Sequence, residues 1–393
     1  MILSILDTDL YKFSTSNAYF TLYPLAEGTF TFNDRAAEVY DDAFLEELRS
    51  AVSDLSALAM TDEEFEFVCS HIRYISRNYW EWLRGFRFEP SKIDFRLDSD
   101  GHLHINVTDL MYKVTLYEVP LLAIVSELRN KRPGVKADLH TVLERLDGKI
   151  DMANQYQLGF SEFGTRRRFS SSIHEAVVRR LKERCPQYCA GTSNVFFAMK
   201  YDMVPVGTFP HEWMMFHSGV FGYKRANYLG LEDWIQVYDG ALGTALIDTF
   251  TTASFLRTLT LKQAKLLDGF RQDSGDEKVI GDMIIRRLEE FGIDPRTKLL
   301  VVSNALDFPK YREVARYFKG RIKISAGIGT NLTCDPGIPG YKAANIVMKL
   351  SRCRMSSKDP WENVIKISDD IGKHMGDNIE FSIASHELHL TNV

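Results

Sequence analysis

Short apolar runs and amphipathic stretches alternate along the chain from about residue 150 onward. The apolar runs predict strands over 158–163, 188–192, 203–207, 245–249, 269–273, 298–303 and 321–325, with a weaker one over 344–350. The amphipathic stretches predict helices over 173–184, 261–267, 277–291 and 311–318. This alternation indicates right-handed βα units and a parallel sheet. Seven or eight such units favour an α/β barrel, and an open doubly wound sheet is the alternative because periodicity does not show closure.

The first 130 residues follow a different pattern, in which helices and strands occur in separate runs. Two helices and three strands are predicted, over 41–58 and 62–84, and over 92–97, 102–107 and 113–119. The turn signal Asp98-Ser-Asp-Gly101 joins the first two strands as a hairpin. Such a sequence of elements is typical of an α+β domain.

The two patterns meet near residue 130, where Asn130-Lys-Arg-Pro-Gly134 has the composition of a turn. We therefore predict an α+β domain over 1–130 and an α/β barrel domain over 131–350. The length of 393 residues agrees with two domains, since single hydrophobic cores stop growing at roughly 250–300 residues.

Composition and charge narrow the class of protein. With 45% hydrophobic and 26% charged residues, the chain matches globular proteins and differs from disordered, collagen-like and disulfide-rich ones. The net charge of −5 argues against a nucleic-acid partner, which would favour a basic excess. No apolar run approaches the ~20 residues of a membrane span, and the first residues lack the basic start of a signal peptide. Five scattered cysteines agree with reduced thiols in a cytoplasmic protein.

Polar, charged or glycine residues follow seven successive predicted strands. They occupy 162–168, 191–194, 207–213, 248–252, 271–275, 303–307 and 325–331. In a βα barrel the carboxyl ends of the strands carry the active site. The coincidence therefore predicts an active site, and the residue types indicate a ligand that carries phosphate or pyrophosphate.

Two pairs of residues in this set suit such a ligand. Gly327 and Gly329 can let backbone amides approach a phosphate, and a helix start after them would add a favourable dipole. Asp248 and Asp273 follow neighbouring strands, so their carboxylates could share a Mg²⁺ that bridges phosphate or ribose oxygens. A simple glycine turn and two helix-capping aspartates are the alternatives. Of the arginines at 166–168, one or two are expected to face an anionic substrate.

His211 is the most informative single residue. Pro210 suits the first turn of a helix, which places His211 at the amino end of that helix. The helix dipole and free amides there would stabilise a negative charge attached to the imidazole, as in a phosphohistidine. The string from His211 to His217 is not a zinc motif, because Met215 stands where the second histidine would be needed. A buried histidine with a structural role is the alternative.

Seven short segments occur along the chain in an order that is typical of one enzyme family. They are Asp7-Thr-Asp-Leu-Tyr-Lys12, Glu162-Phe-Gly-Thr-Arg166, Gly191-Thr-Ser-Asn194, Gly207-Thr-Phe-Pro-His-Glu-Trp213, Ile247-Asp-Thr-Phe250, Gly269-Phe-Arg-Gln-Asp-Ser-Gly275 and Ser303-Asn-Ala-Leu-Asp307. In identity and order they resemble the nicotinate phosphoribosyltransferase family, from Asp7 to about Leu350. The resemblance implies an irregular, incomplete α/β barrel and an α+β domain built from the N-terminal part together with about 350–393.

The resemblance also implies a reaction of NAD salvage. Nicotinate and 5-phosphoribosyl 1-pyrophosphate would give nicotinate mononucleotide and pyrophosphate, with Mg²⁺ as cofactor and ATP as co-substrate. ATP hydrolysis would be coupled through a phosphohistidine, which maps onto His211. A homodimer is a further expectation, in which Tyr11 would come from a second subunit.

Residue by residue, the resemblance assigns one set of positions to nicotinate. Phe163 would stack on the pyridine ring, Tyr11 would cover its other face, and Arg166 would orient its carboxylate. Ser193 would present a neutral hydroxyl where nicotinamide-using relatives carry an aspartate.

A second set of positions is assigned to phosphoribosyl pyrophosphate and its metal. Arg271 and Asp273 would hold the ribose and pyrophosphate, and Asp248 would bind Mg²⁺ or orient His211. The remaining substrate-binding positions are Thr208, Ser303, Gly327 and Gly329, with the two glycines at the 5′-phosphate. Since the pyridine nitrogen is itself the nucleophile, catalysis needs positioning and charge stabilisation rather than a strong base.

Two other functions stay open at this point. A nicotinamide or quinolinate phosphoribosyltransferase is the nearer one, although quinolinate, with two carboxylates, would need a denser basic pocket. A non-catalytic ligand-binding protein on the same fold is the farther one. The joint presence of His211, Asp248, Arg271 and Asp273 argues against it.

Overall fold

The computed structural model of the chain describes residues 1–370 and 376–390. The chain forms two compact units and passes between them several times. The first unit comprises Met1–Asn17, Thr29–Gly207 and Ile328–Lys349; the second comprises Ala18–Gly28, Thr208–Gly327 and the chain from Leu350 onward. These units combine segments that are distant in sequence, so they divide the chain differently from the predicted domains 1–130 and 131–350, which stay a prediction.

The first unit contains an antiparallel sheet with strand order β1-β3-β2. Its strands are β1 (Glu27–Asp34, from Thr29 onward), β2 (Ile93–Leu97) and β3 (Leu103–Leu110). The predicted hairpin is confirmed, since Ile93 pairs with Val107 and Leu97 with Leu103. Oδ1 of Asp98 accepts the N–H groups of Asp100 and His102 in the turn, and Gly101 has a φ of +83°, which glycine adopts without strain.

The predicted strand over 113–119 is wrong. This segment forms α5 (Met111–Val114), the 3₁₀ helix η3 (Thr115–Tyr117) and the start of α6 (Glu118–Arg129). Residues 114–128 are all buried. A run that is buried on every side has no periodicity that separates a strand from a helix, and local sequence therefore could not decide between them.

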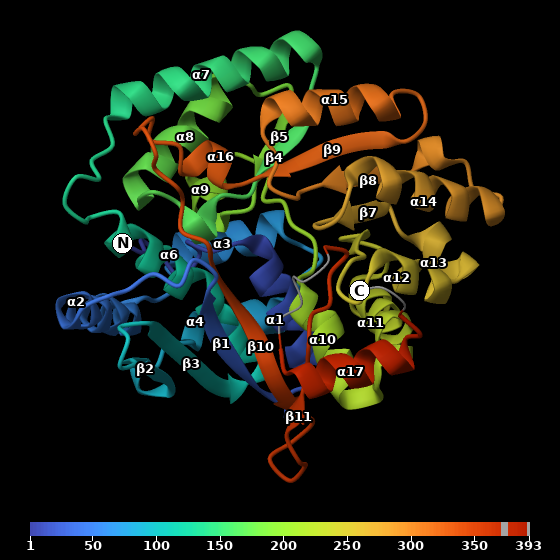
Figure 1. Cartoon of the computed structure of the whole chain (residues 1–393), viewed down its shortest axis with the longest axis horizontal. Coiled ribbons are helices and arrows are strands. Elements are labelled where there is room, and N and C mark those ends of the chain that lie inside the picture. Colours follow the sequence, from blue (N-terminus) through green and yellow to red (C-terminus); the bar gives the residue numbers. More distant parts are fainter. Residues whose placement is uncertain (371–375, 391–393) are drawn as a thin grey trace. The chain divides into compact units, whose positions relative to one another are not determined.

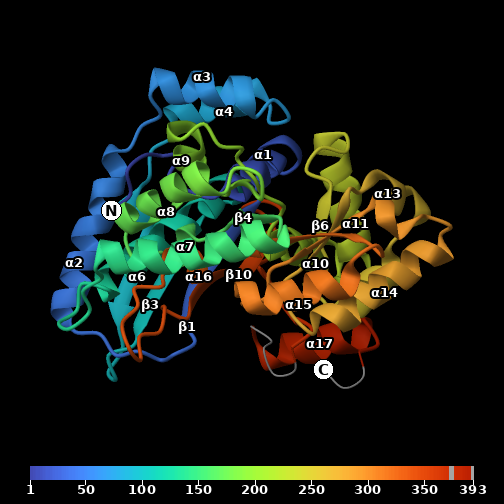
Figure 2. The ribbon, with the colours of Figure 1, turned by 90° about the horizontal axis from the view of Figure 1, so that it is seen from above.

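The predicted helix over 62–84 is divided into two helices. α3 (Asp62–His71) begins with a capping box between Thr61 and Glu64. α4 (Arg77–Gly85) begins at Ser76, whose hydroxyl accepts the N–H of Tyr79. Figure 2 shows the two helices side by side. Ser76 thus supplies a second helix start inside what the hydrophobic pattern alone presents as one helix.

The remaining elements of the first unit include two short parallel strands, β4 (Phe160–Glu162) and β5 (Cys189–Thr192). α7 (Leu139–Tyr156) packs against α8 (Ser171–Arg184), as Figure 1 shows. The other helices and 3₁₀ helices are α2 (Asp42–Ser53), α9 (Val195–Lys200), α16 (Thr330–Thr333), η1 (Asp54–Ala57), η2 (Pro90–Lys92), η4 (Thr165–Arg167) and the first part of α1 (Leu10–Leu22).

Parallel strands in the order β9-β8-β7-β6 form the central sheet of the second unit. They are β6 (Thr244–Leu246), β7 (Gly269–Gln272), β8 (Leu299–Val302) and β9 (Lys323–Ile328, up to Gly327). The segments between them contain α12 (Thr252–Thr258), α13 (Leu261–Leu266), α14 (Glu277–Glu290), η5 (Pro295–Thr297) and α15 (Phe308–Phe318). The strand–helix alternation predicted for this part of the chain is therefore confirmed.

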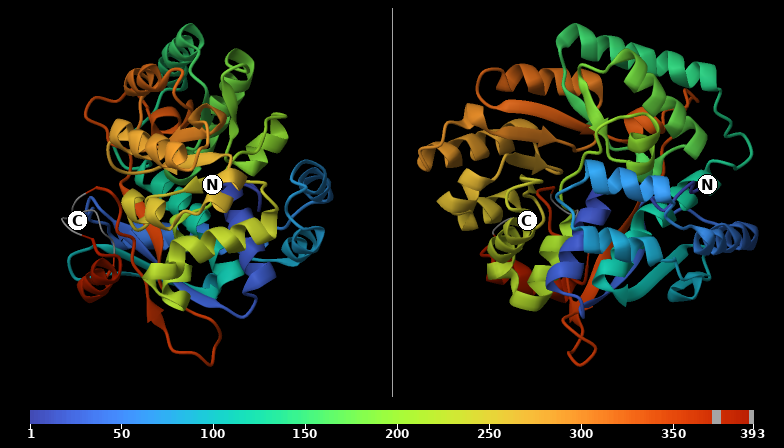
Figure 3. Two further views of the ribbon diagram at one scale, coloured as in Figure 1. Left: turned by 90° about the vertical axis from the view of Figure 1, so that its right-hand side faces the viewer. Right: turned by 180° about the vertical axis from the view of Figure 1, so that it is seen from behind.

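Helix α10 (His211–Phe221) begins at His211, as predicted, and Pro210 occupies the N-cap position just before the first turn. It packs along α11 (Tyr223–Tyr238), and Figure 3 shows both helices, in yellow-green, side by side. Nε1 of Trp213 donates to the carbonyl of Gly230 at 2.8 Å. A Cβ at Gly230 would lie 2.6 Å from Sδ of Met214, so a larger residue there would displace the Met214 side chain between the two helices. The second unit also contains α17 (Asn378–Glu387).

Two further predicted strands differ from the structure. Over 203–207 the structure has an isolated bridge between Thr192 and Pro205 in place of a strand. The run 344–350 is part of β10 (Ile346–Arg354), which pairs antiparallel with β11 (Glu362–Asn363) and so is not an eighth parallel strand. A parallel and an antiparallel sheet confirm the predicted mixed α/β class, and closure into a barrel stays a prediction.

In the described part of the chain no helix has both the length and the apolar character that crossing a membrane demands. All five cysteines are free thiols. The cytoplasmic location stays a prediction.

A buried ion cluster around Arg168 stabilises the first unit. The guanidinium donates to both carboxylate oxygens of Asp7, at 2.7 and 3.0 Å, and to Glu127 at 2.8 Å. The Arg168 side chain is fully buried. Burial by itself raises the pKa of Asp7, but the charge and hydrogen bonds of Arg168 outweigh it and leave that pKa below its usual value.

Replacement of Arg168 should therefore unfold the protein far more readily. Arg168→Met leaves Asp7 and Glu127 as buried carboxylates without their counter-charge, so we expect a loss of about 3–5 kcal/mol in the free energy of unfolding at pH 7, measured by urea denaturation. Arg179→Met removes only an exposed pair with Glu183 and should cost less than about 1 kcal/mol.

The same cluster predicts a pH dependence. Because the folded-state pKa of Asp7 is depressed, its stabilisation is present above its unfolded pKa of about 4 and is lost as the pH falls through the folded value. The stability gap between wild type and Arg168→Met should shrink over that range. A gap that stays constant down to pH 2 contradicts this account.

Candidate active site

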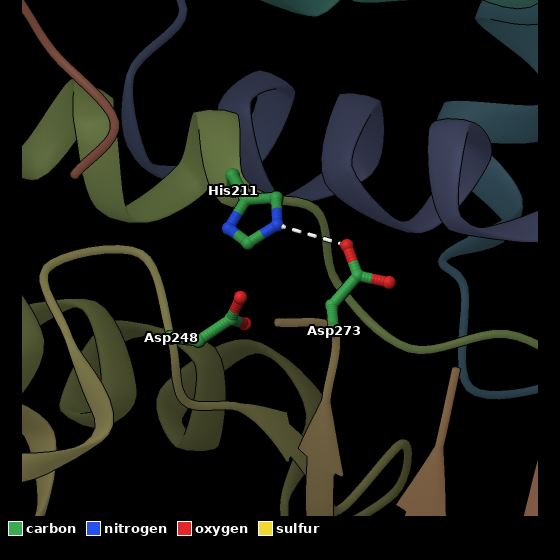
Figure 4. A group of neighbouring side chains, drawn as sticks. All are labelled: His211, Asp248 and Asp273. Atoms are coloured by element: carbon green, nitrogen blue, oxygen red, sulfur yellow. Dashed lines mark hydrogen bonds and ion pairs between the residues drawn. The ribbon is translucent and has the colours of Figure 1, made fainter. Parts of the chain in front are cut away.

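The second unit brings together the residues predicted for phosphate and metal chemistry. Asp248 follows β6 and Asp273 follows β7. The two aspartates lie close together because the carboxyl ends of neighbouring parallel strands meet at one edge of a sheet. His211 is buried at the first position of α10. Figure 4 shows both carboxylates directed toward the imidazole. We call His211, Asp248, Thr249, Arg271 and Asp273 the His211 cluster.

The imidazole of His211 is held at both ring nitrogens. Nε2 lies 3.2 Å from Oδ2 of Asp273, and Nδ1 lies 3.0 Å from the Thr249 hydroxyl. An ionised carboxylate can only accept, so Nε2 carries the proton that Asp273 accepts; in the neutral imidazole Nδ1 then keeps its lone pair and accepts from the Thr249 hydroxyl. The geometry thus gives Asp273 the ring-orienting contact that the family resemblance suggested for Asp248.

Asp273 is ionised for an electrostatic reason. Burial by itself raises its pKa, but the charge of Arg271 and the hydrogen bond from His211 outweigh burial and hold that pKa well below its usual range. The Arg271 guanidinium lies 3.0 Å from Oδ1 of Asp273. It also donates to the hydroxyls of Ser303 and Thr208, at 3.0 and 3.2 Å. The predicted positions Thr208, Arg271, Asp273 and Ser303 therefore form one contact network.

Asp248 has the opposite electrostatics. The pKa of its carboxyl group is raised to about 6, mainly by burial and further by the charge of Asp273, against the opposing charge of Lys366. Oδ2 accepts a short hydrogen bond from Ser274. Oδ1 is buried and has no hydrogen-bond partner among the described residues. A buried carboxylate oxygen without a donor suits coordination to a cation.

His211, Asp248 and Asp273 are also placed to hold a metal ion. One candidate ligand atom from each lies within 4.8 Å of the others. Mg²⁺ takes oxygen ligands and commonly one or two carboxylates, so the two aspartates fit it better than the imidazole does. The residues therefore fit the Mg²⁺ site predicted at Asp248 and Asp273, which stays a prediction.

The first unit brings together Tyr11, Arg166 and Ser193, the positions predicted for nicotinate. The Arg166 guanidinium lies 3.9 Å from Oδ2 of Asp9, 3.6 Å from Oε1 of Glu118 and 6.0 Å from the ring centre of Tyr11. The Ser193 hydroxyl donates to Oδ1 of Asp9 at 2.7 Å. We call these five residues the Arg166 cluster. The guanidinium is thus placed between two buried carboxylates.

Sequence reasoning missed Asp9 and Glu118. Burial raises the pKa of Asp9 despite the nearby charge of Arg166. For Glu118, burial also raises the pKa, but Lys12, Lys349 and Arg166 outweigh it and leave the pKa lowered. Asp9 and Lys12 both lie inside the quoted segment Asp7–Lys12, so its density of charge was an available signal. Glu118 had none, because it stands at the edge of an apolar run.

Phe163 and Gly329 lie against each other in the first unit. The N–H of Phe163 donates to the carbonyl of Ile328 at 2.8 Å, and a Cβ at Gly329 would lie 2.9 Å from the Phe163 carbonyl oxygen. Glycine is therefore required at 329 for a backbone approach. Gly327 lies inside β9, not in a turn. The 5′-phosphate role of both glycines stays a prediction.

The side chain of Glu162 holds the loop that carries Phe163 and Arg166. One carboxylate oxygen accepts the N–H of Gly164, and the other lies 2.5 Å from the Thr192 hydroxyl and 3.1 Å from Nε2 of His174. The charge and hydrogen bond of His174 overcome the effect of burial and lower the pKa of Glu162. Glu162 therefore acts as an ionised anchor for the loop.

The segments that carry both clusters match a known protein family. The family described as "Nicotinate phosphoribosyltransferase (NAPRTase) family" matches residues 158–392, and its N-terminal domain matches residues 6–126. The chain belongs to the nicotinate phosphoribosyltransferase family.

Individual members of this family match almost the whole chain. A nicotinate phosphoribosyltransferase of Chromohalobacter salexigens is 38% identical over 392 residues, with 100% of this chain and 99% of the relative covered. Another, of Methanosarcina mazei, is 36% identical, with 98% of each covered. The crystal structure of the Porphyromonas gingivalis member superposes with a TM-score of 0.97 at 42% identity, with 99% of this chain and 100% of that one covered.

Metal binding by this nicotinate phosphoribosyltransferase family member can be tested directly. Asp248→Asn removes the charge beside the unpartnered oxygen, so we expect Mn²⁺, used as a probe for Mg²⁺, to bind at least about tenfold more weakly by calorimetric titration. Asp239→Asn changes an exposed aspartate outside the cluster and should bind as wild type does. Equal affinity in all three proteins would remove Asp248 from the metal site.

Proposed function

We propose that this chain is a nicotinate phosphoribosyltransferase of NAD salvage. It joins nicotinate to 5-phosphoribosyl 1-pyrophosphate, releases pyrophosphate and forms nicotinate mononucleotide with coupled hydrolysis of ATP. The observation that carries the proposal is the match of almost the whole chain to the family, in a chain where the buried His211 and Asp248 and the partly exposed Asp273 form one cluster. A homodimer and a cytoplasmic location are part of the proposal as expectations.

The Arg166 cluster is proposed to bind nicotinate. The guanidinium pairs with the ring carboxylate, and Asp9 and Glu118 keep the guanidinium oriented before the substrate arrives. Tyr11 and Phe163, both partly exposed, offer aromatic faces to the pyridine ring. Preorganised charge of this kind lowers the cost of orienting the pyridine nitrogen for attack on the ribose carbon.

The His211 cluster is proposed to bind the phosphorylated substrates. Arg271, fixed by Asp273, Ser303 and Thr208, neutralises the pyrophosphate as the bond to ribose breaks. Mg²⁺ held by Asp248 and Asp273 would supply additional positive charge to the leaving group. No general base is required, because the pyridine nitrogen carries its own lone pair.

ATP coupling is proposed to act through His211. The lone pair on Nδ1 attacks the γ-phosphorus of ATP, the bond to the bridging oxygen breaks, and its electron pair leaves with ADP. The proton on Nε2 stays in the hydrogen bond to Asp273, which supports the positive charge that develops on the ring. Water later takes the phosphoryl group from nitrogen and releases free phosphate. The position at the start of α10 favours the added negative charge.

The activity is tested by incubation with nicotinate, phosphoribosyl pyrophosphate and Mg²⁺, with and without ATP, while nicotinate mononucleotide is followed by chromatography. We expect product in both reactions and more product with ATP. If nicotinamide or quinolinate is used in place of nicotinate, a sibling enzyme is indicated; if no base is used, the chain is a non-catalytic binding protein.

The phosphohistidine step has its own prediction. His211→Asn should abolish ATP hydrolysis and ATP stimulation but leave slow ATP-independent product formation, because ribose transfer does not use the imidazole. The measurement is acid-labile ³²P bound to protein after incubation with γ-labelled ATP. His217→Asn is the control on the same helix: His217 contacts Asp233 at 2.8 Å and the Trp213 carbonyl at 2.7 Å, outside the His211 cluster. Label retained in His211→Asn would place the acceptor at another residue.

Base preference follows from Ser193. Ser193→Asp places a second carboxylate against Asp9 and near Arg166, where it would repel the carboxylate of nicotinate. We therefore expect the ratio of kcat/KM for nicotinate to kcat/KM for nicotinamide to fall roughly tenfold relative to wild type. Ser193→Asn has nearly the same size without the charge and separates crowding from repulsion. Comparable efficiency of wild type with both bases would contradict the assigned role.

A further inference from the structure

The chain from Ile367 to Asp370 lies against the loops that carry the His211 cluster. The N–H of Ile367 donates to the carbonyl of Thr249 at 2.9 Å, and the N–H of Asp369 donates to the Ser274 hydroxyl at 3.0 Å. The carboxylate of Asp370 accepts the N–H of Gly275 at 3.1 Å. These bonds fix Lys366, the residue just before this segment, relative to the loops after β6 and β7.

Asp369 strengthens the attachment. Its carboxylate accepts both the N–H and the hydroxyl of Thr252, at 2.9 and 2.6 Å. A Cβ at Gly275 would lie 3.0 Å from Cβ of Asp369, so the segment packs closely on the loop after β7. The segment is thus held by both backbone and side-chain bonds, and the position of Lys366 is preorganised.

The side chain of Lys366 is largely buried, and its ammonium group has no hydrogen-bond acceptor among the described residues. Its side chain is 10% exposed, and Nζ lies 3.7 Å from Oδ2 of Asp248. This is its one ion pair among residues 1–370 and 376–390. In the same unit Lys262 and Lys310 reach their glutamate partners at 2.5 Å. Lys366 therefore does not form a hydrogen-bonded ion pair with Asp248.

An ammonium group at the end of a largely buried side chain, with three donors and no acceptor among the described residues, is placed to receive an anionic ligand. The acidic groups around Lys366 are Asp248, Asp273 and Asp369, whose carboxyl groups all experience its charge. The basic side chains near these carboxylates, besides Lys366, are those of Arg271 and His211. An anion carried by Mg²⁺ would contact the ammonium and satisfy the unpartnered Oδ1 of Asp248 through the metal.

We propose that Lys366 binds phosphoryl oxygens at the His211 cluster. The inference rests on the proposed function, which brings two phosphorylated ligands to this protein: ATP with its γ-phosphoryl group, and phosphoribosyl pyrophosphate with its pyrophosphate. Both present the same chemistry to an ammonium group, namely an anionic oxygen that accepts a charge-assisted hydrogen bond. Lys366 lies outside all the strand ends that the sequence marked as an active site.

Binding titrations test the proposal and separate the two sources. Wild type, Lys366→Met and Lys358→Met are titrated calorimetrically with ATP and, separately, with phosphoribosyl pyrophosphate, each with Mg²⁺. Lys358 is an exposed lysine of the same C-terminal part and serves as the matched control. Loss of a charge-assisted hydrogen bond should weaken binding of at least one ligand by roughly 10–100-fold in Lys366→Met only.

Each outcome has a defined meaning. Weakening confined to ATP assigns Lys366 to the phosphates of ATP. Weakening confined to phosphoribosyl pyrophosphate assigns it to the phosphates of that substrate, and weakening of both assigns it to a shared position. Dissociation constants within twofold of wild type for both ligands overturn the proposal. Lys366→Gln is titrated in the same way if Lys366→Met does not fold, and Lys366→Arg, which keeps the charge, should retain more affinity than either.

The proposed function can fail independently of this inference. Absence of nicotinate mononucleotide from wild type would refute the activity, while the titrations would still report whether Lys366 binds phosphoryl oxygens. A melting temperature of Lys366→Met far below that of wild type, together with dissociation constants of folded Lys366→Gln within twofold of wild type, would indicate that the ammonium only stabilises the fold, and would overturn the proposal.

Discussion

The ionised carboxylate of Asp273 is the contact on which the chemistry of the second unit depends. It accepts from Arg271 and His211 and lies 2.8 Å from the Ser303 hydroxyl, so it links β7, the loop after β8 and the start of α10. Its negative charge helps to orient the guanidinium, which also donates to Ser303 and Thr208, and the imidazole, which also contacts Thr249. The depressed pKa of Asp273 is therefore a structural requirement as well as a chemical property.

Asp248 and Asp273 show how two equal side chains acquire different roles. Arg271 and His211 stabilise the negative charge of Asp273, whereas Asp248 faces burial and a neighbouring carboxylate with only Lys366 and Ser274 as compensation. Environments that move two carboxyl pKa values apart commonly mark chemical function. One aspartate orients the imidazole, and the other keeps an oxygen available for a cation.

The first unit uses charge in a different way. Arg166 and Arg168 are two residues apart, yet Arg168 is fully buried against Asp7 and Glu127 while the Arg166 side chain is 29% exposed beside Asp9 and Glu118. The 3₁₀ helix η4 between Gly164 and Arg168 directs them differently. Arg168 thus stabilises the fold, whereas Arg166 is accessible to a ligand. Both guanidinium groups lie beside buried carboxylates that balance their charge.

The sequence by itself determined the features that are local. Turn chemistry, capping and periodicity account for the hairpin at Asp98–Gly101, the helix start at Pro210 and His211, and the later strand–helix alternation. The identity and order of seven short motifs carried the resemblance to the family. Tertiary structure decided the rest: the helical state of 113–119, the antiparallel pairing of β10, and the partners Glu118 and Lys366. The physical reason is that periodicity reports which side of an element is buried, whereas the charge that stands opposite a buried group comes from a segment far away along the chain.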